Sequence, residues 1–153
     1  MISDFKFQIS NWRKGLLYLL PFTFCLFICG CSMPNLEPTE CTDSRLAVKQ
    51  FYSFHFANEM KFSLDNLKQR EKFLTPEFAK SLQNSTTEND VFTTNSTDVP
   101  KAFRIGECKV IEPTKTNLEI VLFWRDDTRS EQKNIHVEAV KQNDKWLLDK
   151  VLY

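Results

Sequence analysis

The five cysteines and two histidines of this chain are its side chains best suited to covalent, acid–base or metal chemistry. They are Cys25, Cys29, Cys31, Cys41, Cys108, His55 and His136. Neither residue type recurs at the short spacings typical of zinc ligands. We therefore predict no metal site and no cofactor, and ask instead what covalent fate each cysteine has.

Cys31 ends an apolar run, Leu16–Cys31, that follows three basic residues. A basic flank, an apolar stretch of this length and a small residue at its end are typical of a secretory signal peptide. The last four residues, Ile28–Cys31, resemble the lipobox of bacterial lipoprotein signals. This resemblance implies that residues 1–30 are removed, that a diacylglycerol is attached to the Cys31 thiol, and that the new amine carries a further acyl chain such as palmitate.

Lipidation at Cys31 would make the bilayer the first partner of the chain. Several acyl chains anchor a protein far more firmly than one does. Ser32 follows in place of the Asp that favours inner-membrane retention, so the resemblance points to the outer membrane, on its periplasmic face. The alternative is an uncleaved membrane anchor, but Leu16–Gly30 covers 15 residues, whereas a spanning helix needs about 20.

The chain after the leader has 123 residues, the size of one domain. We predict a tether over residues 31–41, because it is rich in proline, and a single domain over 42–153. The 123 residues after the leader carry 17 basic and 19 acidic side chains, a near balance that argues against binding to nucleic acid. In an oxidising compartment the remaining pair, Cys41 and Cys108, predicts a disulfide. Two separate thiols are the alternative.

Helices are expected first along the domain. Caps at residues 42–44 predict a helix that runs to about Lys61 and is well buried along Leu46–Met60. A shorter helix is expected around residues 64–74, and Thr75-Pro76 predicts the start of a third.

Strands are expected afterwards, because apolar residues alternate with polar ones from Phe103 onward. Gly106 is interpreted as a bulge or bend, residues 125–130 as a turn, and Asn143-Asp144 as a tight hairpin connection. The predicted fold class is α+β, with N-terminal helices packed on a curved antiparallel sheet of about four strands.

This order of elements resembles the nuclear-transport-factor-2-like, or cystatin-like cone, superfamily. Within it, the chain is most similar to a bacterial envelope family of unknown function that includes YbjP-type lipoproteins. The residues that carry the resemblance are Phe51-Tyr52, Leu74-Thr75-Pro76, Asp90-Val91-Phe92, Asp98-Val99-Pro100, Ile105-Gly106 and the closing Lys145–Asp149 with Val151. The resemblance implies a cone fold and export, and little chemistry.

Enzymes of the cone superfamily place a carboxylate or histidine with a tyrosine inside the cone. The matching candidates here are Tyr52, His55, Asp98, His136 and Asp149. A buried acid–base role is conceivable for His55, but we favour a partly exposed histidine at the edge of an aromatic helix face. His136 is expected to face away from its apolar neighbours, Asp98 to close a turn through its carboxylate, and Trp146 to be core. We predict that the protein is not an enzyme.

Three function classes remain. We favour a lipid-anchored, non-enzymatic module that docks on another protein of the envelope, since an anchor raises the local concentration of a weak binder. The alternatives are a small-ligand binder whose cone cavity is lined by aromatic residues such as Trp124, and a periplasmic immunity or inhibitor lipoprotein. The candidate cavity or motif residues are Tyr52, Asp98, Trp124, Trp146 and Asp149.

Overall fold

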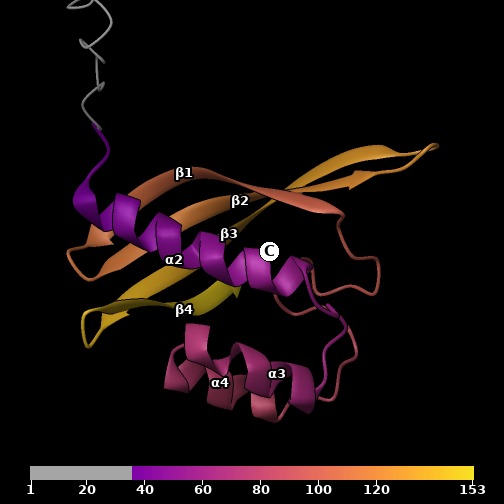
Figure 1. Ribbon diagram of the computed structural model, residues 1–153, viewed down its shortest axis with the longest axis horizontal. Helices are drawn as coiled ribbons and strands as arrows, with labels where there is room; N and C mark the ends of the chain where they lie inside the picture. The colour runs from indigo at the N-terminus through magenta and orange to yellow at the C-terminus, as the bar shows by residue number, and fades with distance from the viewer. Residues whose placement is uncertain (1–35) are drawn as a thin grey trace, which may run out of the picture. The chain divides into compact units, whose positions relative to one another are not determined.

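The computed structural model describes residues 36–153, and its folded unit runs from Glu37 to Tyr153. The expected leader and the lipidation site Cys31 lie outside the described residues. Figure 1 shows the order of elements along the chain: α2 (Thr39–Phe56), α3 (Leu64–Arg70), a 3₁₀ turn η1 (Glu71–Phe73), α4 (Pro76–Gln83), β1 (Ala102–Glu112), β2 (Lys115–Arg125), β3 (Ser130–Gln142) and β4 (Lys145–Leu152).

Helix α2 begins and ends earlier than the sequence predicted. It starts directly after Pro38, inside the stretch expected to be a tether, and Glu40 in its first turn suits the positive end of the helix dipole. It ends at Phe56, because Asn58 turns back: its side-chain amide donates to the carbonyl of Phe54 at 2.7 Å and its backbone N–H to that of His55 at 3.3 Å. The predicted extension to Lys61 was therefore wrong.

The burial expected along α2 was also too wide. Its inner face buries Val48, Phe51, Tyr52 and His55 completely, whereas Leu46 is 59% exposed. The aromatic rings of the inner face pack edge to face: the ring centroids of Phe51 and Tyr52 lie 5.1 Å apart at an interplanar angle of 84°. α2 is thus amphipathic, with one face left open to solvent.

The second predicted helix is split into α3 and η1, after which Leu74 is extended and forms an isolated bridge with Leu148 of β4. The third was correct. Thr75 is the N-cap of α4, its hydroxyl accepting from the N–H of Phe78 at 3.2 Å, and Pro76 takes the first helical position.

The strands form one antiparallel meander in the order β1-β2-β3-β4. The register of β1 against β2 shifts between Ile105 and Cys108, so the bulge expected at Gly106 is confirmed. Asn143 and Asp144 have φ of 48° and 60°, and they join β3 to β4 by the predicted tight turn. The hairpin of β2 and β3 reaches beyond the rest of the sheet (Figure 1).

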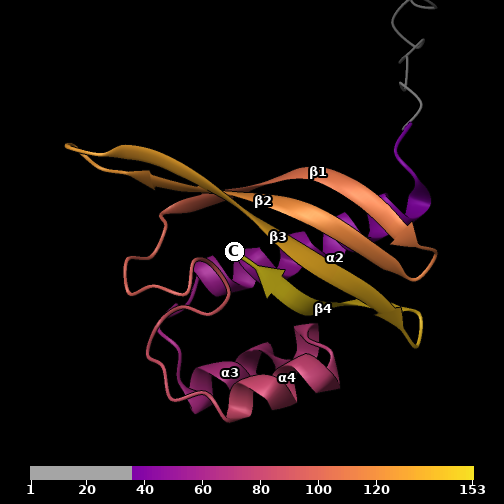
Figure 2. The ribbon, with the colours of Figure 1, turned by 180° about the vertical axis from the view of Figure 1, so that it is seen from behind.

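The expected fold class is confirmed as α+β, with helices on a curved four-stranded antiparallel sheet. Figures 1 and 2 show α2 lying across one face of the sheet, with α3 and α4 beyond the edge formed by β4. The core lies between α2 and the alternating residues of the strands, which are Leu118, Ile120, Leu122, Ile135, Val137, Ala139 and Leu148. The domain therefore has a filled interior behind α2.

Thr75 offers a test of how α4 is held to the sheet. Its hydroxyl caps α4 and also donates to Oδ1 of Asp149 at 2.8 Å, and its N–H donates to the carbonyl of Leu148 at 2.8 Å. We expect Thr75→Val to lower the free energy of unfolding by about 2 kcal/mol, because the N–H of Phe78 loses its cap and the partly buried carboxylate of Asp149 loses a donor.

The control for this prediction is Ser63→Ala in α3. Among residues 36–153 the Ser63 hydroxyl has one partner, the N–H of Asn66, from which it accepts at 3.1 Å at an exposed site. Its loss should cost about 1 kcal/mol or less in the same urea titration. Equal costs for the two substitutions would show that the bond to Asp149 contributes nothing.

Candidate functional site

His55 lies at the centre of a buried polar network that joins α2, α3 and the segment between α4 and β1. Its Nε2 lies 3.1 Å from each carboxylate oxygen of Asp90, and its Nδ1 accepts from Nε of Arg70 at 2.8 Å. The side chains of His55 and Asp90 are fully buried, and Arg70 is 1% exposed. A cation and a carboxylate thus meet opposite edges of one imidazole ring.

The hydrogen bonds select one form of that imidazole. A guanidinium can only donate, so Nδ1 of His55 carries no proton, and Nε2 carries the proton that it donates to Asp90. The other acceptor positions of Asp90 are also used: Oδ1 accepts from the N–H of Phe92 at 3.0 Å, and Oδ2 accepts from the hydroxyl of Thr93 at 2.7 Å. The carboxylate therefore has no position left for a substrate proton.

Arg70 is equally occupied. Its two terminal nitrogens donate to the carbonyls of Asn66, at 2.8 Å, and Glu59, at 2.7 Å. Burial lowers the pKa of Arg70, while the negative charges of Asp90 and Glu59 act in the opposite direction. An arginine remains protonated in proteins under these conditions. The guanidinium thus ties α3 to the turn that follows α2.

Two tyrosines bind the backbone of the segment between α4 and β1, which contains Asp90. Tyr52 donates to the carbonyl of Phe92 at 2.8 Å, as a buried hydroxyl requires, and Tyr153 donates to that of Val91 at 2.5 Å. Burial, reinforced by the charge of Asp90, raises the pKa of Tyr52 well above its usual value and that of Tyr153 to about 12. Both hydroxyls are therefore neutral donors throughout the physiological range.

The prediction of a partly exposed His55 was wrong, because Arg70 and Asp90 supply the partners that allow it to be buried. An open cleft of about 480 Å³ runs past Asn58–Lys61 and the residues around Ser96, and Asp90 is in its wall. The carboxylate of Asp90 nevertheless has no exposed surface. His55, Arg70 and Asp90 therefore have a structural role: they join α2, α3 and the segment between α4 and β1. We call these three residues the buried clasp.

The other acid–base candidates are scattered. The carboxylate of Asp98 was predicted to close its own turn, and this was wrong. Its Oδ2 pairs instead with Arg129 of the β2–β3 hairpin at 2.7 Å. Asp149 accepts from Thr75. His136 faces away from its apolar neighbours, as expected, and its Nδ1 lies 3.0 Å from the side-chain oxygen of Asn117. None of these three side chains joins the His55 network.

The candidate aromatic residues have separate roles. Trp124 is 2% exposed; its Nε1 donates to the carbonyl of Asp98 at 3.3 Å, and Arg129 and Lys133 lie 5.4 Å and 5.3 Å from its ring centroid. Trp124 is therefore core rather than cavity lining. Trp146, predicted to be core, is only partly buried: it packs against the core and also faces a groove on the surface.

This surface groove, the α2–β4 groove, has a volume of about 430 Å³. It lies between α2, η1 and the start of β4. Its lining residues are Asp43, Leu46, Ala47, Gln50, Lys72, Phe73, Lys145, Trp146 and Leu147. Nε1 of Trp146 is buried and finds no hydrogen-bond acceptor in the described part of the chain. The volume is in the range that holds small organic ligands.

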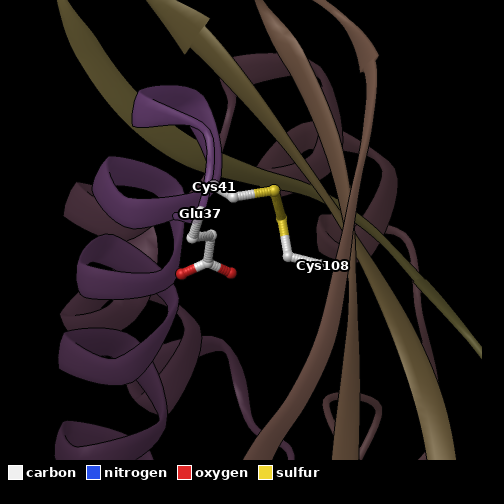
Figure 3. A group of neighbouring side chains, drawn as sticks. All are labelled: Glu37, Cys41 and Cys108. Atoms are coloured by element: carbon white, nitrogen blue, oxygen red, sulfur yellow. A yellow bond between two sulfur atoms is a disulfide. The ribbon is translucent and has the colours of Figure 1, made fainter. Parts of the chain in front are cut away.

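The two cysteines that follow the expected lipidation site form the predicted disulfide. Cys41 in the first turns of α2 is bonded to Cys108 of β1, with a Cα–Cα distance of 5.8 Å. Figure 3 shows the carboxylate of Glu37 beside this bond. Glu37 pairs with Arg45, and Arg45 donates to the carbonyl of Gly106 at 2.7 Å. The start of α2 is thus joined to β1 by a covalent bond and a polar contact.

The ligand atoms of Glu37, Cys41 and Cys108 lie within 4.8 Å of one another, a spacing that a metal ion could bridge. Both sulfurs are already bonded to each other (Figure 3). Metal binding to cysteine requires a thiolate, so the oxidised pair leaves Glu37 as the one strong donor of the three.

Sequence reasoning missed Arg70 and the structural role of Asp90. Asp90 carries a recognisable signal, since an Asp that precedes backbone N–H groups by two residues often forms an Asx turn. Arg70 carries no comparable signal beyond its position three residues after the buried Leu67, on the same helix face.

None of the helices within residues 36–153 combines the length and apolar content that a membrane crossing requires.

No known protein-family model matches the chain, and no curated protein matches it. One similar solved structure is an Ntf2-like protein involved in plasmid conjugation, at 14% identity and a TM-score of 0.46, over 77% of this chain. This chain spans 40% of that protein's length. Another is a protein of unknown function from Bacteroides thetaiotaomicron, at 13% identity and a TM-score of 0.47, over 73% of this chain and 90% of that one. At these identities and TM-scores the likeness carries no conclusion about the function of this chain.

Proposed function

We propose that this protein is a lipoprotein of the bacterial envelope, anchored by acyl chains on Cys31 at the periplasmic face of the outer membrane. The observation that carries the proposal is the Cys41–Cys108 disulfide, whose first cysteine follows the lipobox cysteine by ten residues. Stable disulfides belong to oxidising compartments. The export signal and the structural disulfide are independent features, and both support a compartment outside the cytoplasm.

The geometry around the disulfide suits an anchored domain. Any pull from a lipid anchor would reach the fold at Glu37, the first residue of the folded unit. There the chain meets the ion pair of Arg45 with Glu37 and, four residues later, the disulfide to β1. The anchored end of α2 is thereby prevented from separating from the sheet.

A non-enzymatic role is supported by how the acid–base residues are used. His55, Asp90 and Arg70 satisfy one another in a fully buried clasp, and His136 is an exposed residue paired with Asn117. We therefore propose an accessory module that docks on another envelope protein. A crosslinking pull-down from intact envelopes should recover one reproducible partner, and its absence would count against docking.

Small-ligand binding is a second candidate, favoured by the α2–β4 groove. It would differ from the ligand site expected from sequence, because Trp124 is packed in the core instead of lining a cavity. Nothing in the geometry specifically favours the immunity or inhibitor role.

Cys31→Ser tests the anchor. We expect the substitution to abolish acylation, so that the unmodified chain retains its leader and its mass lacks the added lipid. Cys29→Ser is the matched control, since Cys29 is two residues away and follows the bulky Ile28; it should leave the lipid mass unchanged. An intact leader or a free thiol at Cys31 in the native protein would refute the proposal.

A further inference from the structure

The α2–β4 groove combines an apolar wall with unpaired charges. Leu46, Phe73 and Trp146 supply the wall, and Leu46 leaves 59% of its surface exposed. Lys72 and Lys145 form no ion pair with any described carboxylate. The ammonium of Lys72 lies 4.7 Å from the ring centroid of Phe54 and 4.9 Å from that of Phe73, so aromatic faces hold it at the groove. The two lysines outnumber Asp43, the one carboxylate in the lining, so the site fits a ligand with an apolar part and an anionic group.

The position of the groove on α2 narrows the choice of ligand. Asp43 and Leu46 lie in the first half of α2, and Lys145 and Trp146 follow the β3–β4 turn. The start of α2 and the β3–β4 turn lie at the same end of the sheet (Figure 1), so the groove that these residues line lies toward that end. Cys31 precedes Glu37 by six residues, which span at most about 20 Å. Adding the rise of α2, the near end of the groove lies within about 35 Å of the acylated residue.

Tryptophan, lysine and exposed leucine are the side chains expected at a membrane surface. Indole rings lie at the level of the headgroups, and lysines extend their ammonium groups toward phosphates. Nε1 of Trp146 also lacks an acceptor among residues 36–153. A small movement toward an ester or phosphate oxygen would supply one.

We infer that the α2–β4 groove binds the headgroup and glycerol region of a membrane phospholipid and so holds the domain against the bilayer that anchors it. Lys72 and Lys145 bind the phosphate, and Leu46, Phe73 and Trp146 contact the glycerol and upper acyl chains. This inference rests on the proposed function, because the anchor is what places the groove within reach of the bilayer. Binding of the groove to the bilayer would determine which surfaces of the domain remain accessible to a protein partner.

Tryptophan fluorescence tests the inference. The full chain with Trp12→Phe is isolated from bacterial membranes and reconstituted in phosphatidylethanolamine–phosphatidylglycerol vesicles that contain lipids brominated near the top of the acyl chain. Adding Trp124→Phe leaves Trp146 as the reporter, and adding Trp146→Phe leaves Trp124. We expect bromine to quench Trp146 and not Trp124, which lies about 30 Å along β2 from the end of the sheet where β4 begins.

Charge variants then test the groove in the Trp146 reporter. Lys72→Gln and Lys145→Gln should each lower the docked fraction about fivefold where docking is weak. Lys101→Gln and Lys109→Gln are the controls, because these exposed lysines belong to the opposite, β1 edge of the sheet. Leu46→Ser, at an exposed position that cannot disturb the core, should also reduce the quenching.

Each outcome decides the inference. Quenching of Trp146 that depends on Lys72 and Lys145 supports it. If Cys31 is lipidated and Trp146 is not quenched, the groove does not bind phospholipid, and the proposed lipid anchor still stands. A photo-crosslinker at position 46 that captures a protein instead of lipid also overturns it. An unmodified Cys31, found by mass spectrometry of the same sample, overturns both this inference and the proposed function.

Discussion

Replacing Asp90 with alanine is expected to lower the free energy of unfolding by about 3–5 kcal/mol. The carboxylate of Asp90 accepts from His55, from the N–H of Phe92 and from the hydroxyl of Thr93, all of them buried. Alanine leaves these donors unpaired and removes the negative charge that balances Arg70. Breaking a buried charge pair by removing one partner costs far more than the pair contributes by being present. Urea denaturation followed by far-UV circular dichroism measures the loss.

Asp127→Ala is the matched control for this prediction. Asp127 is exposed at the tip of the β2–β3 hairpin, and its loss should change stability by less than about 0.5 kcal/mol. Near-UV circular dichroism would also show whether the segment around Phe92 loses its packing before the sheet unfolds. An Asp90→Ala variant within about 1 kcal/mol of the unaltered chain would mean that the buried clasp is not a major support of the fold.

Removing the disulfide is expected to have a comparable effect. The bond closes a loop across a sequence separation of 67 residues, for which chain entropy gives about 4 kcal/mol of stabilisation. The double substitution Cys41→Ser and Cys108→Ser should therefore lower the free energy of unfolding by roughly this amount. Treatment of the unaltered chain with dithiothreitol should produce the same shift in the urea midpoint.

The variant that carries both Cys41→Ser and Cys108→Ser is the control for effects of dithiothreitol other than reduction of this disulfide. Dithiothreitol should leave its midpoint unchanged, since no disulfide remains among its described residues. If the reductant shifts neither chain, Cys41 and Cys108 are not bonded in solution. If it shifts both, the effect arises elsewhere than at this pair. Either result would remove the main support for an oxidising compartment.

Much of the fold could be predicted because its signals are local. Thr75 and Pro76 start α4 through a hydroxyl cap and a preset φ. Asn143 and Asp144 tolerate the positive φ of a tight turn. Alternation along Leu118–Trp124 places one side of β2 in the core. Each of these signals acts between residues close together in the chain.

The candidate site was less predictable, because its partners are distant. His55 meets Asp90, 35 residues later, and Arg70, 15 residues later, and neither spacing follows a helix or strand period. The burial of a histidine depends on those partners, so its own neighbours, Phe54 and Phe56, could not settle whether it is exposed. The same holds for Leu46, whose exposure depends on where β4 and η1 lie.

The amino-acid sequence by itself determined the α+β order, the hairpin turns and the choice of Cys41 and Cys108 as disulfide partners, since two cysteines follow the predicted lipobox. Only the tertiary structure decided that His55 is a buried link between a carboxylate and a guanidinium, and that Trp146 borders an open groove. The physical reason is that secondary structure follows from neighbouring residues. Burial and the pairing of charges instead follow from which distant segments pack together.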